Sequence, residues 1–492
     1  MRVVEKINEA VLAKTVQLCR ERGIIIPTFA EMRDPTRIPE KVKQRLSKVA
    51  LTDVNPLNLF RITWKNEPKA KGGLFNRGNW IEFPPELTGV PVRIVGIVGK
   101  HFPTGAHKVG AAFGCLAPRL VSGNFDPTTQ KAVWPSTGNF CRGGAFDSAL
   151  LACKAVAILP EGMSKERFEW LREIGTDEVI ATTGSESNVK EIYDMCWKLR
   201  KERGNGVSIF NQFEEFGNAA WHYAVTAGAV EEIYEQVKQP DSRFAAWISA
   251  TGSAGTIAAG DYLRTRFPHV KVVATEALQC PTLLCNGFGA HRIEGIGDKH
   301  IPWVHNVRNT DMVAAIDDEQ CMSLLRLFNE REGVAFLESE GIKRDLCEKL
   351  PLVGISGVCN LVAAIKAAKY YEMDGRDVIC LPLTDSMDLY GSRLHELGSE
   401  HGKYTRDMAG RHFDRYLAGA APSDLRELGY QDKKALHNLK YFTWVEQQGK
   451  SVEELHALWD PDFWAARFAE VADWDKLIND FNERTGVLKS LS

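Results

Sequence analysis

The sequence predicts an α/β fold built on parallel sheets and extended by helices at both ends. From about Val90 to Asp385, short β-branched runs alternate with longer helical segments, and this alternation is typical of βαβ units. Runs such as VVATEA and VICLPL begin with consecutive apolar residues, as expected for strands that are covered on both faces. Outside this region the chain is helical, which indicates a core with an added segment at each end.

Hydrophobic period and flanking turns predict the individual elements. Candidate strands lie at residues 92–98, 156–159, 178–181, 207–210, 245–249, 271–275 and 378–381, with helices between them such as 165–174 and 187–203. Residues 4–22 carry apolar side chains at helical spacing and end at Gly23. After about Gly402 the chain is polar, helical and Trp-rich, and we expect its tryptophans to fill a small core, with an interface as the alternative.

Composition excludes several classes of protein. The chain has 492 residues and a formal net charge of −3, so it lacks the basic excess of nucleic-acid-binding proteins. Its most apolar long segment, residues 351–368, contains Asn360 and Lys366 and is too polar for a membrane span. The 11 cysteines form no CxxC pair and no metal-ligand pattern, and the N-terminus shows no signal-length apolar stretch. We therefore expect a cytoplasmic protein with no metal, nucleic acid or membrane partner.

Two motifs supply an amine and an anion site after candidate strands, where open parallel sheets bind ligands. In HFPTGAHKVGAAF, Lys108 begins a helix of small apolar residues, and such a setting lowers the pKa of an amine and activates it as a nucleophile. An ordinary surface lysine is the alternative. In PSTGN, hydroxyls and backbone N–H groups at a helix start could form a carboxylate site. The alternative is an ordinary N-terminal helix cap, which has the same sequence pattern.

Two further motifs supply a phosphate cradle and a polar strand end. TGSAGT joins a strand to a helix, as a phosphate cradle does, but it lacks the lysine of an ATP-binding loop; a simple tight turn is the alternative. CLPLTDSMDLY ends a buried strand in Thr384, Asp385 and Ser386, which could equally be turn caps. A phosphorylated aldehyde cofactor would explain all four motifs at once. It needs from the protein an amine for the imine, a phosphate cradle, a partner for the ring nitrogen and a site for the substrate carboxylate. Pyridoxal phosphate is a cofactor with these requirements.

Taken in order, the motifs resemble those of the fold-type II pyridoxal-phosphate enzymes, which share the fold of the tryptophan synthase β subunit, and are nearest to cysteine synthase and cystathionine β-synthase. The resemblance runs over residues 56–390 and includes residues 295–302, similar to a segment that borders the site, and the helix start at Ser356 and Gly357. It implies that Lys108 forms the imine and that Ser386 faces the pyridine nitrogen. It further implies a substrate-carboxylate site of Ser136, Thr137, Gly138, Asn139 and Gln212, with Asn139 also bonding the ring hydroxyl, and a phosphate site of Gly252, Ser253, Ala254, Gly255 and Thr256.

The same resemblance implies the division of the chain. We expect a helical N-terminal extension at residues 1–50 and a helical, Trp-rich C-terminal extension at residues 401–492. Residues 51–100 and 208–400 would form a large cofactor-binding α/β domain, and residues 101–207 a small mobile α/β domain. A homodimer is implied as well.

Some residues depart from the family pattern. His107, placed with the cofactor-binding residues, precedes Lys108 as in the tryptophan synthase β subunit, but the acidic ETGAG loop of that subunit is absent, which disfavours indole chemistry. Phe140 stands where cysteine synthases usually have a small threonine. Arg142 is a candidate for binding a second anionic group on the substrate, or else a solvated arginine, and Cys141 is expected to be a packed residue.

The predicted function is pyridoxal-phosphate chemistry at Cβ of an amino acid. We expect β-replacement through an aminoacrylate intermediate, with a thiol or sulfide as second substrate; β-elimination to pyruvate and ammonia is the alternative. Ser386 as a neutral ring-nitrogen partner favours loss of a β-substituent, and Asp385 in that place would weaken the argument. Two other classes stay open: a nucleotide-binding enzyme that uses TGSAGT for a pyrophosphate and Glu276 for a ribose, and a non-catalytic binding protein.

Overall fold

Two sheets organise the computed structural model, which describes residues 3–68, 73–136, 138–163, 165–184 and 189–491. The larger sheet has seven strands in the order β1-β2-β10-β7-β8-β9-β11, and the smaller has four in the order β5-β4-β3-β6. The strands are β1 (Trp80–Phe83), β2 (Arg93–Val98), β3 (Lys131–Pro135), β4 (Lys154–Pro160), β5 (Glu178–Thr182), β6 (Val207–Ile209), β7 (Arg243–Ala250), β8 (Lys271–Ala277), β9 (Met312–Ile316), β10 (Asp377–Leu383) and β11 (Leu425–Glu427). All pairings are parallel except those of the edge strands β1 and β11, so the predicted α/β class is confirmed.

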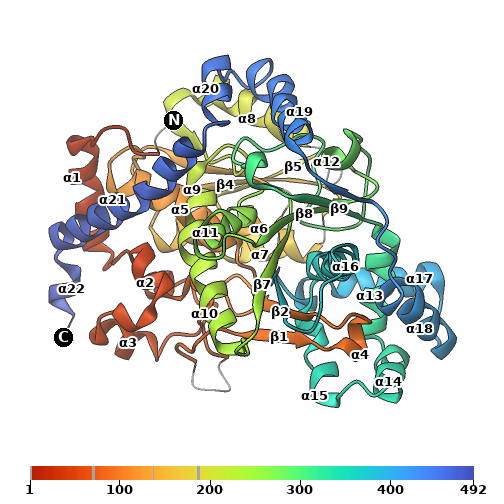
Figure 1. Ribbon diagram of the computed structural model, residues 1–492. Coiled ribbons are helices and arrows are strands. Elements are labelled where there is room, and N and C mark those ends of the chain that lie inside the picture. Colours follow the sequence, from red (N-terminus) through yellow and green to blue (C-terminus); the bar gives the residue numbers. More distant parts are fainter. Residues whose placement is uncertain (1–2, 69–72, 137, 164, 185–188, 492) are drawn as a thin grey trace.

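Helices surround both sheets (Figure 1). Before the sheets come α1 (Glu9–Glu21), α2 (Phe29–Arg33) and α3 (Glu40–Leu46). Between strands lie α4 (Pro85–Thr88), α5 (Lys108–Val121), α6 (Asn139–Leu150), α7 (Lys165–Glu173), α8 (Val189–Arg203), α9 (Phe216–Trp221), α10 (Ala227–Val237), α11 (Ala259–Arg266), α12 (Thr282–Cys285), α13 (Asp318–Asn329), α14 (Arg331–Ser339), α15 (Arg344–Cys347) and α16 (Ile355–Tyr370). After the last parallel strand come α17 (Gly391–His401), α18 (Arg406–His412), α19 (Tyr430–Lys440), α20 (Val452–Ala457), α21 (Pro461–Thr485) and α22 (Val487–Ser490).

Each of the seven predicted strands is present, and four strands were not predicted. The four are β1, β3, β9 and β11. The predicted helix at 165–174 is α7, and the one at 187–203 is observed from Val189 because residues 187 and 188 lie outside the described part of the chain. Strand β6 begins at the predicted domain boundary and pairs with β3 of the smaller sheet. The mobility expected for residues 101–207 stays a prediction.

The two extensions pack on each other. Helix α21 runs beside α1 and α2 and also contacts α5 (Figure 1). The ring of Trp474 on α21 lies 5.6 Å from that of Phe29, and the Asp475 carboxylate accepts hydrogen bonds from the backbone N–H groups of Phe29 and Ala30 at the start of α2. Trp444, Trp464 and Trp474 are buried, as core filling requires.

The C-terminal extension is not wholly helical, which corrects the prediction. Strand β11 pairs antiparallel with β9 and closes one edge of the larger sheet. A strand of three residues is too short to show a reliable alternation of polar and apolar side chains, and its partner β9 lies more than one hundred residues away in the sequence. For these reasons the sequence did not predict this strand.

Helix α16 belongs to the core of the larger domain. Its residues from Ile355 to Ala368 are all buried. Within the described residues no single helix is long and apolar enough to cross a membrane; only the segment Arg344–Leu352 taken together with Ile355–Tyr370 passes that test, and the two are bent by 119°.

We predict that Trp474→Ala destabilises the protein, because the indole is buried between the two extensions. Deleting a buried aromatic side chain costs about 3–5 kcal/mol. Thermal denaturation should therefore show a clear fall in Tm. The matched control is Trp197→Ala, whose side chain is 44% exposed and should change Tm little. Equal Tm values for the two variants would contradict the packing described for α21.

Candidate active site

The amine of Lys108 is buried at the centre of the predicted motifs. Lys108 is the first residue of α5, and its Nζ donates to Ser253 Oγ at 2.9 Å and to Gln212 Oε1 at 3.2 Å. Burial lowers the pKa of this amine to about 8, because the charged form loses its hydration. The predicted imine lysine thus faces TGSAGT, and a useful fraction of it is neutral near physiological pH.

The TGSAGT turn is an anion cradle. Within the described structure, none of the backbone N–H groups of residues 252–255 donates a hydrogen bond to a protein oxygen. A Cβ on Gly255 would lie 2.0 Å from Asn218 Oδ1, so the backbone approaches its neighbours too closely for any side chain there. Ala254 has φ +59°, a left-handed conformation that turns successive N–H groups the same way. The turn therefore offers a row of free donors of the kind that binds phosphate.

His107 supports this cradle from the side of Lys108. Its Nε2 lies 3.2 Å from Thr256 Oγ1, and its ring stacks on Trp64. Burial, together with the neighbouring Lys108, lowers the pKa of His107 to about 3, so the imidazole is neutral. A neutral ring beside the lysine adds no charge that would repel a protonated amine.

The loop after β3 meets Lys108 through Gln212. Ser136 Oγ accepts from Gly138 N at 3.0 Å and from Gln212 Nε2 at 3.3 Å, so one glutamine side chain links the loop to the lysine amine. Phe140 lines the same cavity. Thr137, also predicted to bind the substrate carboxylate, lies outside the described residues.

Asn139 is held from behind by the strand end of the larger sheet. Its Nδ2 donates to Asp385 Oδ2 at 2.7 Å, and the Tyr390 hydroxyl donates to the same oxygen at 2.7 Å. The Oδ1 atom of Asn139 is buried and has no partner within the described residues. The amide is therefore oriented by the large domain and keeps one free polar atom.

The structure places Ser386 outside the lining of the cavity, and its predicted role toward the ring nitrogen stays a prediction. Thr384, two residues earlier, lines the cavity, whereas Ser386 is buried beyond it at the start of a 3-10 turn, Met387–Leu389. Strand β10 ends at Leu383, and of the three residues that follow it only Thr384 lines the cavity. Asp385 points to Asn139 and Tyr390 and does not line the cavity either.

Arg142 also lies elsewhere than predicted. Its guanidinium packs 4.4 Å from the centre of the Trp170 ring and does not line the cavity. Burial, together with neighbouring Arg167, lowers its pKa to about 10. α6 carries this side chain toward α7, because the first turn of α6 faces the helix that bears Trp170. Arg142 is therefore neither solvated nor in position to bind a second anionic group, while Cys141 is buried as expected.

Four residues of the site were not assigned from the sequence. Asn218, at the start of α9, donates from Nδ2 to Ser253 Oγ and to the Gln212 carbonyl. Asn360 on α16, Thr384 after β10 and Asp298 in the predicted bordering segment 295–302 line the cavity. Each follows or lies within a motif, but only the fold shows that its side chain points inward.

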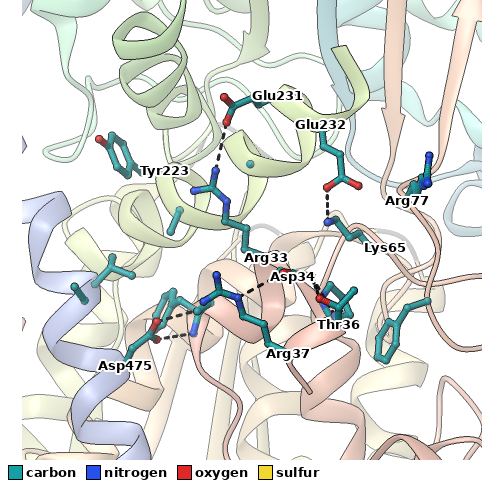
Figure 2. Close-up of a pocket in the computed structure, with 18 of the residues that line it drawn as sticks. Arg33, Asp34, Thr36, Arg37, Lys65, Arg77, Tyr223, Glu231, Glu232 and Asp475 are labelled. Atoms are coloured by element: carbon teal, nitrogen blue, oxygen red, sulfur yellow. Dashed lines mark hydrogen bonds and ion pairs between the residues drawn. The ribbon is translucent and has the colours of Figure 1, made fainter. Parts of the chain in front are cut away.

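A larger cavity, about 1470 Å³, lies between the N-terminal extension, α10 and α21 (Figure 2). Three of its cationic side chains pair with carboxylates of the same lining: Arg33 with Glu231, Arg37 with Asp34, and Lys65 with Glu232. Since these charges are already neutralised and Lys108 is not among its lining residues, this cavity is not the candidate active site.

Comparisons with known proteins agree with this geometry. A family model described as "Pyridoxal-phosphate dependent enzyme" matches residues 99–385, more than half of the chain. The chain therefore belongs to the family of pyridoxal-phosphate-dependent enzymes, and its cofactor is pyridoxal phosphate.

Relatives of this chain are named cysteine synthase and cystathionine beta-synthase. The chain is 27% identical over 283 residues to a probable cysteine synthase of Bacillus subtilis, covering 57% of this chain and 82% of the relative. It is 23% identical over 389 residues to the cystathionine beta-synthase of Saccharomyces cerevisiae, covering 77% and 73%. The solved O-acetyl serine sulfhydrylase isoform 3 of Entamoeba histolytica shares the fold, with a TM-score of 0.55, 21% identity, and coverage of 69% of this chain and 93% of that one.

The residues present fit the cofactor. The free N–H groups of residues 252–255 suit its phosphate, the amine of Lys108 suits its aldehyde, and the free Oδ1 of Asn139 leaves a polar atom for a ring substituent. Thr384 supplies a hydroxyl at the strand end. These groups converge from four separate segments on one cavity, as cofactor binding requires.

We predict that Gly255→Ala weakens cofactor binding. The added methyl would collide with Asn218, and overpacking of this kind costs about 1–3 kcal/mol, which corresponds to roughly 5- to 150-fold in affinity. Titration of cofactor-free protein with pyridoxal phosphate measures the effect. Gly206→Ala is the control, since a Cβ at Gly206 meets nothing within 4 Å. An unchanged affinity in Gly255→Ala would contradict the assignment of the cradle.

We also predict how attachment of the cofactor depends on pH. Only the neutral amine attacks an aldehyde, and the pKa of Lys108 is lowered to about 8. The attachment rate should therefore rise about tenfold per pH unit below this value and level off above it. Stopped-flow absorbance on cofactor-free protein gives the profile. A rate that kept rising up to pH 10 would indicate a solvated lysine instead.

Proposed function

We propose that this enzyme catalyses β-replacement on an amino acid, with a sulfide or thiol as second substrate. The observation that carries the proposal is the placement of Lys108 Nζ between the phosphate cradle and the Ser136–Gln212 pair. That placement leaves an amine beside an anion site, which is where the Cα–H bond of a bound amino acid must lie. Relatives named cysteine synthase and cystathionine beta-synthase support the same class of reaction.

The roles of the chain's own residues follow from this arrangement. When bound, the cofactor supplies an electron sink for the substrate carbanion. Ser136, Asn139 and Gln212 orient the substrate carboxylate, and orientation of the Cα–H bond is itself a large part of the rate. The Lys108 amine accepts the Cα proton as general base, and its pKa of about 8 suits that role near neutral pH.

The polar group at the strand end favours reaction at Cβ. Thr384 is a neutral hydroxyl, and a hydroxyl does not hold a proton on a ring nitrogen as a carboxylate does. The nearby carboxylate of Asp385 is engaged by Asn139 and Tyr390 and has its pKa raised by burial. Thr384, rather than Ser386, is therefore the neutral hydroxyl that we propose as partner of the ring nitrogen.

The competing nucleotide-binding function requires an acidic residue that binds a ribose in the cavity. Glu276 was the candidate, but its carboxylate accepts hydrogen bonds from the backbone N–H groups of Leu283 and Leu284 and is buried. It caps α12 and does not line the cavity. β-Elimination to pyruvate and ammonia stays the second candidate, since solved neighbours include a hydrogen sulfide-producing enzyme of Fusobacterium nucleatum.

We propose in addition that the enzyme is a cytoplasmic homodimer. The absence of disulfides among its cysteines is compatible with a reducing compartment. The dimer rests on the resemblance to the family, and sedimentation of the purified protein tests it.

The test of the function is a panel of β-substituted amino acids. We expect cysteine, serine or O-acetylserine to give a new thioether when an aliphatic thiol is added, with Lys108→Ala as the inactive control that also loses the visible absorbance of lysine-bound cofactor. Mass spectrometry identifies the product, and pyruvate assays measure elimination. Pyruvate alone would favour the second candidate, and the absence of both products with every amino acid would refute chemistry at Cβ.

A further inference from the structure

One carboxylate lines the cavity, and the reaction as described does not use it. Asp298 is the only acidic residue among the side chains around the Lys108 amine in the described structure. Its side chain is 4% exposed, and neither oxygen accepts a hydrogen bond within the described residues. It forms no ion pair there with lysine or arginine; only His300 Nδ1 lies nearby, 3.1 Å from Oδ2. A buried, unsatisfied carboxylate facing a reaction cavity needs an explanation.

The backbone around Asp298 is fixed against the phosphate cradle. A Cβ on Gly252 would lie 2.8 Å from the Gly295 carbonyl, so the two segments are in direct contact. The Thr282 hydroxyl donates to the Asp298 carbonyl at 2.5 Å. The backbone that carries Asp298 is therefore anchored beside the cradle.

Behind Asp298, two side chains extend the polar contact away from the cavity. His300 Nε2 lies 2.9 Å from the Tyr193 hydroxyl, and the other ring nitrogen of His300 faces Asp298. The His300 ring packs on Phe213. His300 therefore lies between the Asp298 carboxylate and the Tyr193 hydroxyl.

The C-terminal extension holds this arrangement in place. Trp444 Nε1 donates to the Ile301 carbonyl at 2.8 Å, and its ring lies 5.5 Å from that of His300. Buried Lys440 donates to the carbonyls of Trp303 and His305 at 3.0 and 2.7 Å. Both residues lie outside the region matched by the family model, so the extension braces one wall of the active site.

The proposed function leaves one proton without an acceptor. Once Lys108 has taken the Cα proton and the β-substituent has departed, its amine is an ammonium that must return a proton to Cα. It cannot at the same time accept the proton of an incoming nucleophile. A second base is therefore required whenever that nucleophile arrives as X–H.

We propose that Asp298 is this base, and that the second substrate is a nucleophile that arrives protonated, an aliphatic thiol or water. This inference rests on the proposed function and names the nucleophile class. The X–H proton passes to an oxygen of Asp298 while the lone pair of X forms the bond to Cβ. The electron pair of the substrate's Cα=Cβ bond moves to Cα, where the Lys108 ammonium delivers its proton. X–H has then added across the double bond, and Asp298 returns its proton to solvent. His300 and Tyr193 are positioning residues.

The test separates the two halves of the reaction by stopped-flow absorbance on cofactor-loaded enzyme. O-acetylserine alone gives the spectral change of the first half, and added 2-mercaptoethanol restores the starting spectrum in the second. For Asp298→Asn we expect an unchanged first half and a second half slower by roughly 100-fold, the lower end for loss of a general base. Thionitrobenzoate, a thiol already ionised at neutral pH, needs no base and should not be slowed. Lys299→Gln, on the same segment but outside the cavity lining, should match the wild type in both halves.

The outcomes are distinct. If Asp298→Asn slows the second half equally with both thiols, Asp298 has only a structural role. If it slows the second half with neither thiol, Asp298 has no role in this step. Either outcome overturns the inference about Asp298 and leaves the proposed function standing. His300→Gln should move the pH profile of the thiol half and leave the first half unchanged, and an unmoved profile would refute its positioning role. If no β-substituted amino acid produces the first spectral change in the wild type, the proposed function itself fails.

Discussion

The contact between the Lys108 amine and the TGSAGT turn is the constraint on which the rest of the site depends. Nζ lies 2.9 Å from Ser253 Oγ, inside a cavity that removes most of its hydration. The fall of its pKa from 10.5 to about 8 corresponds to roughly 3 kcal/mol in favour of the neutral amine. Burial thus keeps a fraction of the Lys108 amine neutral near neutral pH, and this neutral fraction is the nucleophile that the free N–H donors of the turn lie beside.

The two sheets contribute different halves of this site. The larger sheet supplies the cradle after β7 and Thr384 after β10, whereas the smaller sheet supplies Ser136 after β3 and Gln212 after β6. All of these residues follow carboxyl ends of parallel strands, where polar loops gather in such folds. Asn139 and Asp385 form a buried hydrogen bond, which joins the two halves of the site directly.

The extensions are part of the active site's support. The N-terminal helices pack on α21, α21 contacts α5, and α5 begins with Lys108. Further along the chain, Trp444 and Lys440 bind carbonyls of the segment that carries Asp298 and His300. Carbonyl groups that are hydrogen-bonded in this way cannot shift independently. Trp444 and Lys440 therefore stiffen the segment that carries Asp298 and His300, although they lie outside the region matched by the family model.

The sequence by itself determined the α/β class, the cofactor and the turns that line the cavity, because each motif is a contiguous turn leading from a strand into a helix, and local hydrogen bonding decides such turns. Only the tertiary structure decided that Thr384 rather than Ser386 lines the cavity, since this depends on where β10 ends against its neighbours. It also decided that Arg142 packs on Trp170, that Asn218 supports Ser253 and that Asp298 lines the same cavity as Lys108. These contacts join residues far apart in the chain, and side-chain direction across such distances follows from packing, which no local pattern encodes.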